Sequence, residues 1–182
     1  MQTDVELIKR SKKGDQQAFA EIVKRHEAIV KKTTYSMVGR REIADDVAQE
    51  VFIRFYKNMG QFKSEAALST YLVRIAINLS LNEREKMKRQ RNNFIKYSRE
   101  ARLTPVFERP DKFGQKELIN EALQKLEEEF RSVVVLRLID GYSVQETADI
   151  LELPKGTIAS RLNRAQKKLL EIFQEMKILD QI

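Results

Sequence analysis

The sequence predicts an all-α protein with two small helical domains joined by a linker, the C-terminal domain containing a helix-turn-helix. Only 6 glycines and 3 prolines interrupt its 182 residues. Apolar residues recur at three- and four-residue spacing over long stretches, and the alternation typical of β-strands is scarce. We expect one domain over residues 1–91, a linker over 92–112 and a second domain over 113–182.

Two helices are expected before residue 40. The first begins near Thr3 and Asp4 and ends at Gly14. Asp15 is a natural N-cap for the second, which Gly39 closes. The residues that this second helix turns toward a core are Phe19, Ile22, Val23, His26, Ile29 and Val30. The single histidine is therefore expected to be structural.

A third helix is expected from Glu42 to about Met59. Its apolar face comprises Val47, Ala48, Val51, Phe52 and Phe55, and its polar side carries Asp46, Gln49, Glu50 and Arg54. A loop with Gly60 and one conspicuous aromatic residue, Phe62, follows. No helical stripe includes that ring, so we expect it to be exposed, with a core phenylalanine under the loop as the alternative.

A fourth helix is expected after Ser69. Its apolar face comprises Tyr71, Leu72, Ile75 and Leu79, ends near Leu81, and gives way to an almost purely charged stretch. Residues 92–112 contain two prolines and no clear period, which indicates a linker.

Two more helices are expected before the helix-turn-helix. The first presents Leu118, Ile119, Ala122, Leu123 and Leu126 on one face. The second ends at Asp140-Gly141, where glycine suits the position just after a helix.

Residues 143–169 have the pattern of a helix-turn-helix with a basic second helix. Ser143 and Glu146 have capping-box spacing, and Pro154 suits the start of the next helix. The turn between the helices falls at Glu152, where a positive φ would cost roughly 1 kcal/mol.

The second helix of this motif has two distinct faces. A buried stripe is expected from Ile158, Leu162, Ala165, Leu169 and Ile172. The remaining face carries Lys155, Thr157, Ser160, Arg161, Arg164, Lys167 and Lys168, with no acidic residue between Lys155 and Leu170. The DNA major groove accepts such a cationic helix. The alternative is a two-helix hairpin with a solvated basic face.

Composition points to a polyanionic partner and away from catalysis. The formal net charge is +7, which suggests nucleic acid or an acidic membrane surface. The chain has no cysteine and one histidine, and it contains no glycine-rich phosphate-binding loop. Asp45 and Asp46 are adjacent in a helix and point in different directions, so they do not form a catalytic or metal-binding pair. We therefore expect no enzyme activity, no cofactor and no metal. The polar start and the lack of a long apolar run predict no membrane insertion and a cytoplasmic location.

A second electropositive cluster follows the fourth helix. It comprises Arg84, Lys86, Lys88, Arg89 and Arg91. The cluster lies near Asn78, Asn82 and the ring of Phe62, which together could hold phosphates and capture unstacked bases. A solvated basic face is the alternative.

Four segments in order resemble a bacterial RNA polymerase sigma factor of the extracytoplasmic-function (ECF) type. DDVAQEVFIRFYKN (45–58) is similar to the polymerase-binding helix of that family, and LSTYLVRIAINLSLNEREKMKR (68–89) to its −10 recognition and melting helix. LEEEFRSVVVLRLIDGYSVQETADIL (126–151) and LPKGTIASRLNRAQKKL (153–169) are similar to the C-terminal domain and its −35 helix. The resemblance spans nearly the whole chain.

There are departures from the family pattern. Tyr71 stands for the usual Trp, Asn82 for Asp, Glu127 for Pro, Thr147 for Ile and Gln166 for a common Arg. The last removes one potential phosphate contact, and none breaks the architecture.

The resemblance implies roles for individual residues. Asp46, Gln49 and Glu50 would bind core RNA polymerase, and the Phe62 loop would receive a flipped base. Other expected contacts to promoter DNA are Arg74, Asn78, Arg84, Lys88 and Arg89 at the −10 element and Lys155, Thr157, Ser160, Arg161, Arg164 and Lys168 at the −35 element. For Thr157 the alternative is stabilisation of the helix N-terminus.

The implied partners are core polymerase, promoter DNA and an anti-sigma factor. Two rival classes are a helix-turn-helix regulator that acts without core polymerase and a basic adaptor for a membrane surface or another protein. The first leaves the N-terminal domain unused, and the second does not explain the ordered motifs.

Overall fold

The computed structural model describes residues 2–62, 67–101 and 114–176, and their regular structure is helical without exception. The helices are α1 (Asp4–Ser11), α2 (Gln16–Val38), α3 (Arg41–Asn58), the 3-10 helix η1 (Met59–Gln61), α4 (Leu68–Ala101), α5 (Gln115–Lys125), α6 (Glu128–Val134), the π-helical turn η2 (Val135–Ile139), α7 (Val144–Leu151) and α8 (Lys155–Glu175). The predicted all-α class is confirmed. Within these three ranges no helix is long and apolar enough to cross a membrane.

Local capping signals set most helix ends where the sequence predicts them. Ser143 and Glu146 form a reciprocal capping box at the start of α7. Asp15 caps α2 through the backbone N–H of Ala18. Gly39 ends α2 with a φ of 81°. Glu152 adopts the predicted left-handed conformation, with a φ of 53°, in the turn between α7 and α8.

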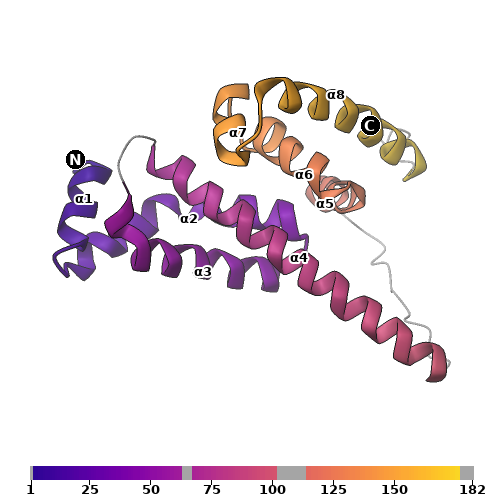
Figure 1. Cartoon of the computed structure of the whole chain (residues 1–182), viewed down its shortest axis with the longest axis horizontal. Helices are drawn as coiled ribbons and strands as arrows, with labels where there is room; N and C mark the ends of the chain where they lie inside the picture. Colours follow the sequence, from indigo (N-terminus) through magenta and orange to yellow (C-terminus); the bar gives the residue numbers. More distant parts are fainter. Residues whose placement is uncertain (1, 63–66, 102–113, 177–182) are drawn as a thin grey trace.

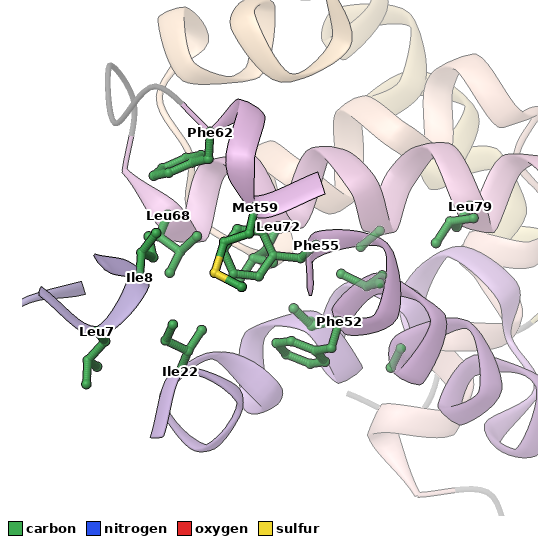
Figure 2. Packing of buried hydrophobic residues seen from close by; sticks show 14 of the residues in the cluster. Leu7, Ile8, Ile22, Phe52, Phe55, Met59, Phe62, Leu68, Leu72 and Leu79 are labelled. Atoms are coloured by element: carbon green, nitrogen blue, oxygen red, sulfur yellow. The ribbon is translucent and has the colours of Figure 1, made fainter. Parts of the chain in front are cut away.

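Helices α1 to α4 form the N-terminal bundle. Its core contains fully buried residues from all four helices, including Leu7, Ile22, Phe55 and Leu72 (Figure 2). Burying a side chain of this size contributes about 1.5–3 kcal/mol, so this core holds the four helices at defined angles.

Helix α4 is longer than the sequence analysis predicts. It continues to Ala101 and extends well past the N-terminal bundle (Figure 1). The expected linker over residues 92–112 is therefore corrected for residues 92–101, which are helical. Charged and amide side chains have adequate helix propensity, so a missing apolar stripe does not end a helix. The rest of the predicted linker lies outside the described residues.

Helices α5 to α8 form the C-terminal bundle. Val133, Ala148 and Ile158 join α6 to the two helices of the helix-turn-helix. Leu123, Phe130 and Ala165 belong to a second buried cluster. The predicted core position of Ile119 is wrong, because its side chain is 44% exposed on the outer face of α5.

The two bundles pack against each other through apolar side chains. Met37 of α2 and Val73 and Ile77 of α4 lie in one cluster with Leu126 and Leu136 of the C-terminal bundle. All five side chains are almost completely buried. In Figure 1 the C-terminal bundle lies along α2 and the first half of α4.

Candidate nucleic-acid interface

The outward face of α8 is cationic and carries no acidic residue from Lys155 to Leu170. Lys155, Ser160 and Arg164 are exposed, as are Asn163 and Lys167 between them. The opposite stripe buries Ile158 and Ala165 completely. Lys167 belongs to the cationic face that the sequence predicts, whereas Asn163 was missed, although its spacing of three residues from Ser160 was a usable signal.

Two of the predicted contacts on α8 turn sideways toward α6. Arg161 pairs with Glu129 at 2.9 Å, and its side chain is only 27% exposed. Lys168 pairs with Glu127 at 2.7 Å and lies over the ring of Phe130 at 5.2 Å. Its hydrogen bond to Glu127 lowers the pKa of that carboxyl. Both cations lie at the rim of the face rather than at its centre.

Thr157 lies in the first turn of α8 and is partly exposed. The backbone N–H of Thr157 donates to the carbonyl of Pro154, and no side chain caps this helix end. The alternative role for Thr157, stabilisation of the helix N-terminus through its hydroxyl, therefore has no observed contact to support it.

Helix α4 carries the predicted −10 residues. Asn78 is exposed, and Arg74, which is 37% exposed, forms an ion pair with Glu152 of the C-terminal bundle. Lys88 and Arg89 are exposed further along the helix, where Arg89 pairs with Glu85. The exposed residues offer donors to a phosphate backbone, while Arg74 is already paired across the two bundles.

The predicted DNA contact at Arg84 is corrected by the structure. Its guanidinium donates to the carbonyl of Met37 at 3.3 Å and to Oε1 of Gln124 at 2.5 Å, between the two bundles. Burial lowers the pKa of Arg84. A side chain that is 19% exposed and engaged on both sides cannot reach a phosphate in this arrangement.

The expected exposure of Phe62 is also wrong. Its ring is 9% exposed and packs edge-on against Tyr71, with ring centroids 5.1 Å apart, and against Phe55 at 6.2 Å. The ring therefore belongs to the core, as the alternative interpretation had it. The loop neighbours at 63–66 lie outside the described residues.

Helix α3 presents the predicted polymerase contacts on its exposed side. Asp46 and Gln49 are exposed, and Glu50 pairs with Arg54 at 3.1 Å. On the same helix, Ile53 is 45% and Tyr56 48% exposed.

Ile53 and Tyr56 are large apolar side chains of α3 that do not belong to its predicted core stripe. They line a surface hollow of about 430 Å³ together with Gln16, Phe19, Phe52 and Lys57. An apolar surface beside polar groups is typical of protein contacts. Their spacing of four and seven residues from Gln49 was the missed signal.

Comparison with known proteins identifies the class of this chain. A family model described as Sigma-70 region 2 matches residues 22–90, and one described as Sigma-70, region 4 matches residues 116–169. These matches fall on the two bundles and define a sigma-70-type factor.

The relatives narrow this class to one family. The ECF RNA polymerase sigma factor SigW of Bacillus subtilis is 36% identical over 172 residues, which is 89% of this chain and 92% of SigW. The ECF sigma-E factor of Escherichia coli is 30% identical, covering 92% of each chain. The chain therefore belongs to the ECF RNA polymerase sigma factors.

Solved structures share the fold. CnrH in complex with the cytosolic domain of CnrY has a TM-score of 0.67 at 23% identity, over 93% of this chain and 96% of CnrH. RpoE in complex with the anti-sigma factor NepR, from Bartonella quintana, has a TM-score of 0.65 at 22% identity, over 86% of this chain and 96% of RpoE. The two-bundle architecture is thus the architecture of sigma factors.

Proposed function

We propose that the chain binds core RNA polymerase and directs promoter recognition and strand opening in transcription initiation. The observation that carries this proposal is the cationic face of α8, which carries no acidic residue from Lys155 to Leu170 and is exposed on a bundle separate from the exposed polar and apolar face of α3. One surface suits a DNA groove and the other suits a protein, and family membership supports assigning them to promoter and polymerase.

At the −35 element, α8 enters the major groove with Lys155, Ser160 and Arg164 foremost. An arginine that reads a guanine edge through two hydrogen bonds contributes about 1–3 kcal/mol of discrimination. A lysine that contacts phosphate adds affinity without sequence preference. Arg161 and Lys168 bind the flanking backbone once they exchange their glutamate partners for phosphate.

At the −10 element, α4 holds the opened strand. Asn78, Lys88 and Arg89 supply amide and cationic donors to bases and phosphates. Flipping a base costs a few kcal/mol, so strand opening needs contacts that exist only in the opened state. Phe62 supports the surface from beneath through its packing on Tyr71.

Core polymerase binds α3 through Asp46, Gln49 and Glu50, with Ile53 and Tyr56 extending the contact. Ile53 and Tyr56 supply the apolar area at the centre of this contact, and Asp46, Gln49 and Glu50 supply polar groups that fix the orientation of the partner. The chain acts in the bacterial cytoplasm beside the polymerase, has no catalytic activity of its own, and is controlled by an anti-sigma factor, the kind of partner bound to RpoE in the neighbouring structure.

Reconstituted transcription tests this function. Purified chain and cognate core polymerase are incubated with genomic fragments, and initiation at specific start sites is the expected result. Binding to duplex DNA by the chain alone, with no initiation in the presence of core enzyme, would instead favour a helix-turn-helix regulator.

Two substitutions and one control assign the surfaces. Asp46→Arg weakens polymerase pull-down with unchanged helical circular dichroism, because the side chain is exposed. Arg164→Ala weakens promoter binding, whereas Lys13→Ala removes the same charge from the exposed turn after α1 and leaves binding unchanged. Equal losses from both charge removals would show that only net charge matters.

A further inference from the structure

The beginning of α6 presents two carboxylates to one side of α8. Oε2 of Glu129 lies 2.9 Å from a guanidinium nitrogen of Arg161, and Oε1 of Glu127 lies 2.7 Å from Nζ of Lys168. Arg161 and Lys168 are seven residues apart, which is about two helical turns, so they lie on the same side of α8. Each of these two cations therefore already has an anionic partner within its own bundle.

The other cations of α8 differ from this pair. Within residues 2–62, 67–101 and 114–176, no carboxylate forms an ion pair with Lys155, Arg164 or Lys167, and these three side chains are exposed. In this part of the chain, α8 thus carries three cations that any DNA can approach and two that a carboxylate neutralises.

Lys168 is held on two sides. Its ammonium lies 5.2 Å from the centre of the Phe130 ring, which is itself buried. A cation over the face of an aromatic ring is attracted to it, so the ring keeps the ammonium close to Glu127. The hydrogen bond from Lys168 lowers the pKa of Glu127, and this carboxyl is therefore ionised at neutral pH.

A carboxylate and a DNA phosphate compete for the same donors. Each cation that binds a phosphate releases a counterion, which steepens the salt dependence of affinity by about 0.9 in the logarithmic slope. A cation that is already paired gains little from the exchange unless the phosphate is held at hydrogen-bonding distance. Contacts between a helix and base edges hold the flanking phosphates in this way, whereas DNA bound through its outer charges alone does not.

We propose that Glu127 and Glu129 are specificity-determining residues, which keep Arg161 and Lys168 from binding DNA of arbitrary sequence. On such DNA, α8 binds through its exposed cations, and both ion pairs persist. At the correct sequence, base contacts of α8 bring two phosphates to its side, and these phosphates replace the carboxylates. The inference rests on the proposed function, because α8 must be the helix that reads the −35 element.

Fluorescence anisotropy of the full chain with two labelled duplexes tests this role. One duplex has a random sequence, and the other is selected by the parent chain from a random pool. Affinity is measured at salt concentrations from about 50 to 200 mM, a range over which phosphate contacts dominate the change. The variant carries both Glu127→Gln and Glu129→Gln, which remove the two charges and keep the size of the side chains.

The two duplexes are expected to respond differently to this double variant. Affinity for the random duplex is expected to rise about tenfold at about 100 mM salt, and the slope of log affinity against log salt concentration to steepen by about 1.8, as two added phosphate contacts require. The selected duplex is expected to keep the parent slope, because its phosphates already replace both carboxylates. Its affinity is expected to rise only about threefold, since the exchange no longer breaks two surface ion pairs.

A matched control separates this competition from net charge. Glu117→Gln with Glu121→Gln removes the same two charges from α5 of the same bundle, and Glu121 pairs with Lys125 of its own helix at 3.9 Å. This control is expected to keep the parent slope on both duplexes. Melting temperatures are measured in parallel, because a purely structural role of the two glutamates would lower stability without steepening the salt dependence. If the double variant loses helix, Glu129→Gln alone is expected to steepen the slope by about 0.9.

The outcomes distinguish this inference from the proposed function. An unchanged slope on the random duplex, or an equal change in the α5 control, would overturn the role of Glu127 and Glu129 even if the chain initiates transcription with core polymerase. Equal steepening on both duplexes would show that the carboxylates limit affinity without affecting specificity, and would also overturn it. If the pool yields no enriched sequence and core polymerase does not initiate, the proposed function fails, while the slope on the random duplex still decides whether the carboxylates compete with phosphate.

Discussion

Replacing Arg131 by methionine is expected to cost about 3–5 kcal/mol of unfolding free energy. The guanidinium donates four hydrogen bonds to main-chain carbonyls, at 2.5 to 3.2 Å, and no part of the side chain is exposed. A hydrogen bond with a charged partner contributes about 1.5–3 kcal/mol, but burying the charge costs several kcal/mol in return. The net loss is therefore smaller than the sum of four bonds.

Methionine fills much of the space yet takes a charged donor away from four carbonyls, of which that of Met37 keeps Arg84 and that of Leu123 keeps the backbone N–H of Leu126. In a chain of this length each kcal/mol lowers the melting temperature by about 2–4 °C, so a fall of about 6–20 °C is expected. Burial, followed by the nearby charge of Arg84, lowers the pKa of Arg131 to about 9. The group therefore stays protonated at pH 7, and its four bonds are charge-assisted.

Thermal unfolding followed by circular dichroism measures this effect. Arg131→Lys keeps the charge but not the planar fork of donors, so it is expected to recover only part of the loss. Arg41→Met on the exposed start of α3 controls for the substitution itself. A melting temperature of Arg131→Met equal to that of the Arg41 control would refute the idea that this guanidinium holds the α5–α6 loop and the end of α2.

Three further changes test the site. Phe62→Ala is expected to cost about 3–5 kcal/mol of stability and to leave duplex −35 binding intact; full stability with transcription rescued only by a pre-melted bubble would show base capture instead. Burial raises the pKa of Asp140, against the hydrogen bond from Thr33 and the charge of Lys32, while Tyr142 faces the same group. Because the pKa of Asp140 is raised in the folded chain, the stabilising contribution of its protonated carboxyl is present below about pH 4 and is lost as the pH rises through the raised pKa. Asp140→Asn should therefore flatten the pH dependence of the free energy of urea unfolding above about pH 4, and an unchanged profile would contradict this. Glu129→Gln frees Arg161 on α8 from its ion pair, so the affinity for duplex DNA is expected to rise up to about fivefold, and the slope of log affinity against log salt concentration is expected to steepen by about 0.9. Unaltered affinity across salt concentrations would show that the ion pair does not compete with phosphate.

Local sequence signals determined the helices, the caps and the family of this protein. The capping box at Ser143, the N-cap at Asp15 and the turn at Glu152 all lie where the sequence predicts them, and the first helix begins at the expected place, where Thr3 and Glu6 form a capping box. These features depend on residues within about one helical turn of each other, so they can be read without the fold. The order of four segments along the chain predicted two sigma regions, which both family models match.

Only the tertiary structure decided which charged and aromatic groups are free. Nothing in the sequence distinguishes Arg84 and Arg131 from the exposed Arg164. In the structure, however, Arg84 and Arg131 both donate hydrogen bonds to the carbonyl of Met37, which lies 47 and 94 residues away from them along the chain. Phe62 lies in the core because Tyr71 and Phe55 flank it. Burial is a property of packed neighbours far apart in the chain, and neither periodicity nor charge predicts which neighbours those are. The contact between the two bundles follows from the same cause, since each bundle presents a surface that is complete only when the other covers it.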